Sequence, residues 1–153
     1  MSLPPNLSFA GIDFEHESLY DGLLRNRVSF TEPSFFSWLG VTMYLKENAI
    51  DAVLRTIAQF PAKSEITFTF SQPQDTLSIQ ESSFHASLSK IVSGVGEPFV
   101  SFFTPAAIEI KLHQAGFKTI AFLSKEEAEE RYFCQRPADL HIPRRSAIAY
   151  ATL

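Results

Sequence analysis

The sequence predicts an α/β fold built on a mostly parallel sheet. Short apolar runs alternate with segments of helical periodicity along the chain. The run 35–39 is apolar on both faces, which is typical of a strand in a parallel sheet that is covered on both sides. Clear helix starts follow later, at Thr104-Pro105 and at Ser124 with Glu127. Strands that alternate with helices form such sheets, since right-handed crossovers lay the helices against the faces.

The N-terminal part of the chain contains the first three expected strands. Leu7 to Phe14 is a short expected strand, and His16 to Asn26 is a helix with its apolar residues on one side. Phe35 to Leu39 is the next strand. Glu47 to Phe60 is the clearest helix, because its apolar residues follow helical spacing up to a proline. Ser64 to Phe70 alternates apolar and polar residues, as a strand with one better-buried face does.

The C-terminal part continues the alternation after a polar stretch. A short helix is expected from Phe84 to Ser93. A second helix begins at Thr104 and ends at Gly116, which supplies the left-handed terminus. Phe117 to Leu123 is a strand, Ser124 opens another helix, and Ala147 to Leu153 is the final strand. We find no internal repeat and no linker, so residues 1–153 are expected to form one domain.

The charge and the residue composition of the chain limit the kinds of partner that we expect it to bind. The 153 residues carry a formal net charge of −4, which does not favour nucleic acid or anionic membranes. The chain has one cysteine and no apolar run of the ~20 residues that a membrane span needs. An internal disulfide is therefore excluded, and a cytoplasmic location is expected.

Motifs with an obvious chemistry are sparse. The chain has no cysteine pair, no His-Glu-x-x-His and no calcium loop, so no metal site is predicted. Asp13-Phe14 follows the first expected strand. Its carboxylate can accept a hydrogen bond from an exocyclic amine, and its ring can pack against a purine. The alternative is that Asp13 caps the helix that follows it.

The stretch from Phe35 to Leu45 predicts a strand, a glycine turn and the entry to a helix. Open α/β sheets bind their ligands just beyond the carboxyl ends of their strands. The turn around Gly40 is therefore the expected ligand-binding position. We identify no catalytic base.

Four segments together resemble the leucine carboxyl methyltransferase-like family. They are SFAGIDFE, FFSWLGVTMYL, AIDAVLRTIAQFP and FFTPAAIEIKLHQAGFK. The resemblance is strongest to the bacterial branch of S-adenosylmethionine-dependent O-methyltransferases. It runs over essentially the whole chain but only over the latter half of a family member.

The resemblance implies part of a Rossmann-like class I methyltransferase sheet, strands 3 to 7 with flanking helices. Leu7 to Phe14 resembles strand 3, Phe35 to Leu39 strand 4 and Ser64 to Phe70 strand 5. The two C-terminal strands correspond to the terminal pair, which includes an antiparallel strand. The stretch 71–103 resembles the insertion that helps to cover the substrate.

The same resemblance implies site residues. Asp13 and Phe14 match the pair that contacts the adenine of S-adenosylmethionine. Leu39 matches a cofactor-contacting residue that is glutamate in many relatives, so any polar contact there must come from its backbone. Tyr44 is a candidate substrate-binding residue, with packing at the helix entry as the alternative. Lys46 stands where relatives often have a capping threonine, and lysine is a poor cap.

The glycine-rich cofactor loop of the family has no counterpart in this sequence. We therefore expect a fragment of an O-methyltransferase for a small carboxylate or hydroxyl acceptor, inactive alone and with weak or absent cofactor binding. An exposed sheet edge would favour a homo-oligomer. The alternatives are a non-catalytic binding or assembly module with the same fold, and an unrelated α/β domain with a different strand order.

Overall fold

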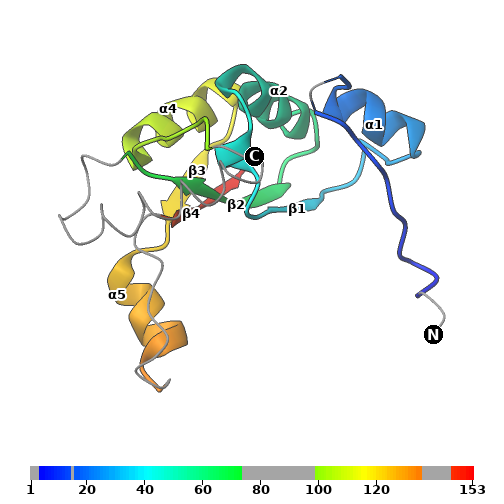
Figure 1. The fold of residues 1–153 in the computed structure, drawn as a ribbon. Coiled ribbons are helices and arrows are strands. Elements are labelled where there is room, and N and C mark those ends of the chain that lie inside the picture. The colour runs from blue at the N-terminus through cyan, green and yellow to red at the C-terminus, as the bar shows by residue number, and fades with distance from the viewer. Residues whose placement is uncertain (1–3, 15, 74–98, 136–145) are drawn as a thin grey trace.

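A computed structural model describes residues 4–14, 16–73, 99–135 and 146–153, and the central feature of these ranges is a four-stranded sheet. Its order is β1-β2-β4-β3 (Figure 1). The strands are β1 (Phe35–Trp38), β2 (Glu65–Ser71), β3 (Thr119–Phe122) and β4 (Ser146–Thr152). All four match expected strands to within a few residues at each end.

Pairing in the sheet is mixed rather than mostly parallel. β1 and β2 are parallel, and Phe36 lies beside Ile66 in their register. β4 is antiparallel both to β2 and to β3, with Ala149 beside Phe68 on one side and Phe122 on the other. The antiparallel strand in the terminal pair, which the family resemblance implied, is therefore confirmed. Apolar periodicity alone does not distinguish the direction of a strand.

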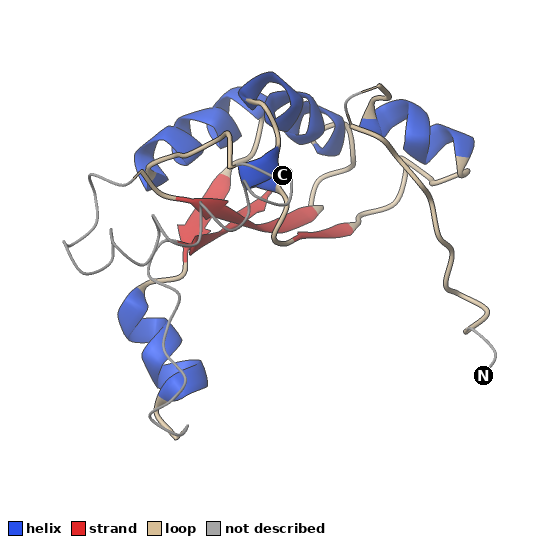
Figure 2. Cartoon of the chain, viewed as in Figure 1, coloured by secondary structure: helices blue, strands red, loops and turns tan. Residues whose placement is uncertain are grey.

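One face of the sheet is covered by two helices, α2 (Glu47–Ile57) and α4 (Pro105–Ala115) (Figure 2). The alternate residues of β2 that point to these helices are 0% exposed. Alanines on β4 leave room for large side chains above them. The core consists of Ile50, Val53, Leu54, Ile57, Ile66, Phe68, Phe70, Phe103, Ile108, Leu112, Phe117, Ala149 and Ala151.

The two covering helices begin differently. Thr104 caps α4, because its hydroxyl accepts a hydrogen bond from the amide of Ala107 at 3.2 Å. Gly116 ends α4 with φ of 113°, a left-handed conformation that glycine adopts without strain. Lys46 stands at the N-cap of α2 and makes no side-chain capping hydrogen bond, as expected from its side chain.

The strand expected from Leu7 to Phe14 is not formed, and that prediction was wrong. Within residues 4–14, the structure assigns no strand. Leu7 and Phe9 are 46% and 77% exposed, so the alternation of apolar residues does not bury them here. A strand is held by hydrogen bonds to a neighbour, and this segment packs beside helix α1 (Leu19–Arg25) instead.

β1 is an edge strand of the described sheet, although its apolar run suggested a strand covered on both faces. Phe35 is 62% exposed. Among the described residues, no helix covers much of one face of the sheet, because α2 and α4 lie on the other (Figure 1). We call this the open face. The side chains on it are, by strand register, Phe35, Ser37, Glu65, Thr67, Thr69, Thr119, Ala121, Ser146, Ile148, Tyr150 and Thr152.

The helix that opens at Ser124 is α5 (Lys125–Ala128), which runs on into a π-helical turn over Glu129–Phe133. α5 and this turn lie on the side of the sheet opposite to α2 and α4 (Figure 2). The helix expected from Phe84 to Ser93, and most of the expected insertion 71–103, lie outside the described residues. In the parts that are described, no helix is both long and apolar enough to span a bilayer.

Candidate functional site

β1 and β2 are parallel, so their carboxyl ends lie at the same edge of the sheet. The chain leaves β1 there through Leu39, Gly40 and Val41. Gly40 has φ of 72°, which any other residue except asparagine or aspartate adopts at a cost. Leu39 is 53% exposed, so its side chain is not held in the core. The turn thus presents backbone at the position where α/β sheets bind ligands.

Two hydrogen bonds fix this turn to β2. The amide of Gly40 donates to Thr69 Oγ1 at 2.7 Å, and Thr42 Oγ1 donates to the carbonyl oxygen of Thr69 at 2.7 Å. Thr42 is 1% exposed, so its hydroxyl needs such a partner. Neither threonine was singled out from the sequence. A threonine within a strand, such as Thr69, or one four residues beyond a strand, such as Thr42, is too common to be recognised without its partner.

Tyr44 lies next to the turn, in the 3-10 helix Thr42–Tyr44. Its side chain is 39% exposed, and its ring centroid is 5.3 Å from that of Phe99. The segment around Phe99 is tied down, because the amide of Val100 donates to the carbonyl oxygen of Met43 at 2.8 Å. Tyr44 is therefore both a packing residue and an accessible one.

Asp13 is positioned by the attachment of its segment to α1. Arg25 Nη2 donates to the carbonyl oxygen of Gly11 at 2.9 Å. The side chain of Ile12 covers Gly22, where an added Cβ would lie 2.5 Å from Ile12 Cδ1. The glycine that weakens the helical pattern of α1 therefore has a packing role. These contacts hold the backbone on the N-terminal side of Asp13 against the helix.

The carboxylate of Asp13 remains accessible. Its side chain is 64% exposed, and its Oδ2 lies 2.8 Å from His16 Nδ1. The backbone carbonyl of Asp13 also accepts from the amides of His16 and Glu17, which turns the chain toward α1. A carboxylate has room for several donors, so the contact with His16 leaves it able to accept from an amine.

Phe14 and Trp38 both lie at the border of the hydrophobic core. Phe14 packs against the core as a partly buried residue, and so does Trp38, which ends β1. Asp13 itself is on the surface. The structure thus contains an exposed carboxylate, an aromatic ring and a rigid glycine turn, the group types that an adenosine moiety would require.

Trp38 has a property that the sequence does not reveal. Its indole Nε1 is buried and has no hydrogen-bond partner, which is rare for a buried donor. The ring lies 6.1 Å from that of Phe68, centroid to centroid. Trp38 is the single tryptophan of the chain, so its fluorescence reports on this end of β1 alone.

Sequence comparison supports the resemblance on which these residues were chosen. The family described as leucine carboxyl methyltransferase matches residues 1–58, which include Asp13, Leu39 and Tyr44. The chain is also 28% identical over 141 residues to YktD of Bacillus subtilis strain 168, which is named as an S-adenosyl-L-methionine-dependent methyltransferase. The likeness to the leucine carboxyl methyltransferase family covers the first 58 of the 153 residues. The alignment covers 92% of the methyltransferase-like chain but 46% of YktD, so the chain spans about half the length of that relative.

Solved structures agree at the level of the fold. A protein of Nostoc punctiforme classed as an O-methyltransferase matches with a TM-score of 0.52 and 14% identity, over 80% of this chain and 32% of that one. A protein of Thermotoga maritima described as an S-adenosylmethionine-dependent methyltransferase matches with a TM-score of 0.50 and 8% identity, over 80% and 57%. The α/β methyltransferase fold is thereby confirmed.

Proposed function

We propose that this chain carries part of the site of an S-adenosylmethionine-dependent methyltransferase that acts on an oxygen atom of a small acceptor in the cytoplasm. The observation that carries the proposal is the rigid Leu39–Val41 turn at the carboxyl ends of two parallel strands, within a region that matches the methyltransferase family. A fixed backbone at that position is what a bound nucleoside requires. The family resemblance supplies the identity of the nucleoside.

Each proposed site residue has a distinct role. Asp13 accepts a hydrogen bond from the exocyclic amine of adenine, and Phe14 packs against the base. Leu39 contributes its backbone, because its exposed side chain has no polar atom. Tyr44 borders the acceptor. No residue is assigned as a catalytic base.

The bound cofactor would supply a methyl group made electrophilic by its sulfonium. The chain's own contribution is orientation and the exclusion of water, which are the main requirements of an in-line transfer. A carboxylate acceptor needs no general base, whereas a hydroxyl acceptor does. The absence of a glycine-rich acidic motif from the 153 residues leads us to propose that the chain alone is inactive and binds the cofactor weakly.

A non-catalytic binding or assembly module is the second candidate, and the free edge of β1 favours it. Phe35 exposes an aromatic ring there, and an unpaired strand edge can add a strand from another chain. In this role the fold is kept while the nucleoside site is not used. Two copies that pair through β1 would form a homodimer.

Calorimetry with two ligands distinguishes these candidates. Since this chain offers adenine contacts but no loop for the methionine moiety, adenosine and S-adenosylmethionine should bind with similar affinities, in the range of about 1 mM. Asp13→Ala should weaken both at least about tenfold, because an acceptor for the amine is lost. Glu109→Gln, which removes an exposed negative charge on α4, is the matched control and should change neither.

The opposite results would favour the assembly module. No heat of binding from either ligand at about 10 mM would remove the nucleoside site. Equal affinities of the wild type and Asp13→Ala for the two ligands would show that they bind at a site that does not include Asp13. A circular-dichroism spectrum of each variant confirms that the comparison is between folded proteins.

A further inference from the structure

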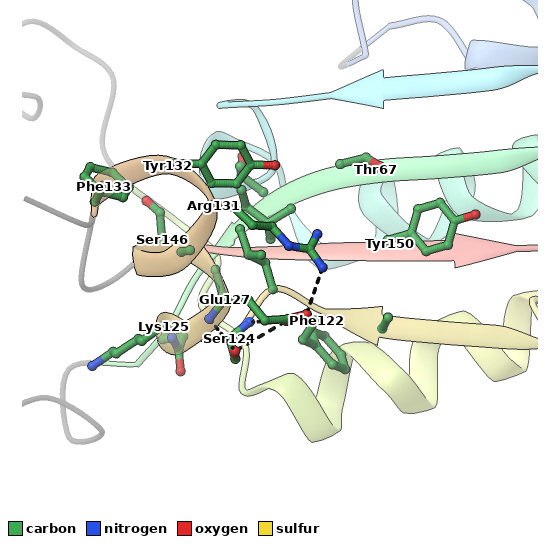
Figure 3. Close-up of a pocket in the computed structure, with 17 residues that line it drawn as sticks. Thr67, Phe122, Ser124, Lys125, Glu127, Arg131, Tyr132, Phe133, Ser146 and Tyr150 are labelled. Carbon is green, nitrogen blue, oxygen red and sulfur yellow. Dashed lines mark hydrogen bonds and ion pairs between the residues drawn. The ribbon is translucent and has the colours of Figure 1, made fainter. Parts of the chain in front are cut away.

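The open face of the sheet is hollowed beside α5 and the π-helical turn. The hollow has a volume of about 740 Å³, which is the size of a small-molecule site. Its floor is formed by the ends of β2, β3 and β4, and its wall by α5 and the turn (Figure 3). Thr69 belongs both to this floor and to the hydrogen bond that holds the Gly40 turn.

The wall of the hollow is locally fixed by hydrogen bonds. Ser124 and Glu127 form a reciprocal capping box, in which the Glu127 amide donates to Ser124 Oγ at 3.1 Å. The amide of Cys134 donates to the carbonyl oxygen of Glu129 at 2.8 Å, five residues back. Such π-helical turns are rare and occur frequently at functional sites.

The π-helical turn carries a cation toward the hollow. Arg131 lies over the floor in Figure 3, whereas Lys125 points away from it. Arg131 Nη2 donates to Glu127 Oε1 at 3.1 Å, which uses one of the five N–H groups of a guanidinium. The remaining face of the guanidinium keeps the planar geometry that binds a carboxylate with two hydrogen bonds.

The floor combines apolar and hydroxyl groups. Ala121 and Ile148 provide apolar surface, and Thr67 and Tyr150 are side by side in the register of β2 and β4. A hydrogen bond to Glu65 raises the pKa of the Tyr150 phenol, with burial and the charge of Glu65 acting in the same direction. Tyr150 is therefore neutral at physiological pH and adds no negative charge to the floor.

We propose that this hollow binds a small amphipathic carboxylate, with its acidic group on Arg131 and its apolar body over Ile148 and Ala121. The hollow combines an apolar floor, a guanidinium that lies over it and a wall that is locally fixed by hydrogen bonds. It is independent of methyl transfer and of Asp13. The site lies on the open face, while the proposed nucleoside position lies at the turn after β1. Thr69 lies between the two and borders both.

The test is a calorimetric titration of the full chain with 4-phenylbutyrate and with its uncharged amide, 4-phenylbutanamide. Wild type should bind the acid more tightly than the amide. Arg131→Gln should weaken binding of the acid about tenfold, the value of one charge-assisted interaction, and leave the amide unchanged. Arg55→Gln removes an exposed cation from α2, on the opposite face of the sheet and outside the lining of the hollow, and should change neither affinity.

A third variant separates ligand binding from a change in folding. Glu127→Gln keeps a capping box but removes the carboxylate that competes for Arg131. It should raise the affinity for the acid several-fold. Equal binding of the acid and the amide, or equal binding by wild type and Arg131→Gln, would overturn the proposal. No saturation by the acid at about 10 mM would also overturn it and would leave the hollow as a seat for a polypeptide segment.

Discussion

Single residues determine how well the elements of this fold begin and end. Thr104, Ser124 and Ser18 each cap a helix through a hydroxyl, whereas Lys46 does not cap α2. The positions of Thr104, Ser124 and Lys46 were readable from the sequence, because capping depends on neighbours three residues away. Ser18 was not predicted as a cap, because the first helix was expected to begin at His16. The lack of a hydrogen-bond partner for Trp38 Nε1 could not be predicted from the sequence, because it depends on what surrounds the ring in three dimensions.

Replacing Lys46 by threonine should stabilise the chain. The N-cap of α2 has extended backbone angles, φ −66° and ψ 152°, that suit a capping hydroxyl. Lys46→Thr should raise the free energy of unfolding by about 1 kcal/mol, measured by urea denaturation. Lys46→Ala is the control, since it removes the same charge without an acceptor. Equal stability of the two variants would show that the cap is not formed.

Lys111 should stabilise the contact between α4 and α2 in a pH-dependent way. Its side chain is 12% exposed. Its ammonium bonds to Glu47 and, at 3.0 Å, to Asp51, and lies 5.4 Å from the centre of the Phe103 ring. Burial acts to lower the pKa of Lys111, but the hydrogen bonds and charges of the two carboxylates outweigh it and raise that pKa. The contribution of Lys111 to stability is therefore fully present at a pH below about 10.4, the pKa of an unfolded lysine. It is lost as the pH rises through the higher pKa of Lys111 in the folded protein.

The variant Lys111→Met tests this contribution. It keeps most of the side-chain length and should lower the free energy of unfolding at neutral pH by about 1 kcal/mol. The difference from wild type should narrow as denaturation is repeated toward a pH of about 11, because wild type then loses its charge. A difference that is constant with pH would assign the effect to packing alone.

At the scale of elements, the pattern of apolar residues predicted where most strands and helices lie in the sequence. It did not predict which neighbours pack against them. Ser64 to Phe70 became β2 because its alternation matches one buried face. Leu7 to Phe14 has a similar pattern and forms no strand, since a strand also needs a neighbour. The run at β1 is apolar on both faces, yet the structure covers only one of them. A sequence indicates that a face is apolar and leaves its partner undetermined.

The exposed edge of β1 should drive self-association. Phe35→Lys places a charge on an edge residue that is 62% exposed, and charges on edges oppose strand addition. Sedimentation velocity should show a concentration-dependent dimer for wild type and a monomer for this variant. Phe9→Lys, at a residue 77% exposed and outside the sheet, is the matched control and should leave the dimer intact. A wild type that stays monomeric at high concentration would contradict the prediction.

At the scale of the whole molecule, the sheet order β1-β2-β4-β3 with its antiparallel β4 matches the terminal part expected from the resemblance. The fold was therefore largely predictable, because four short motifs resemble those of a family with this sheet. The site was only partly predictable. Asp13 and the Gly40 turn were proposed from their positions after apolar runs, while Thr69, Thr42 and Arg131 gained significance only from the three-dimensional arrangement.

The most direct test of the central claim is a nuclear magnetic resonance titration of the full chain with adenosine, followed through backbone amides. Asp13 and the Leu39–Val41 turn should form two sides of one nucleoside site. We predict that amides of residues 11–14 and of residues 38–42 shift together with one dissociation constant, and that Asp13→Ala abolishes both sets of shifts. Shifts confined to one of these segments, or shifts that persist unchanged in Asp13→Ala, would contradict the account.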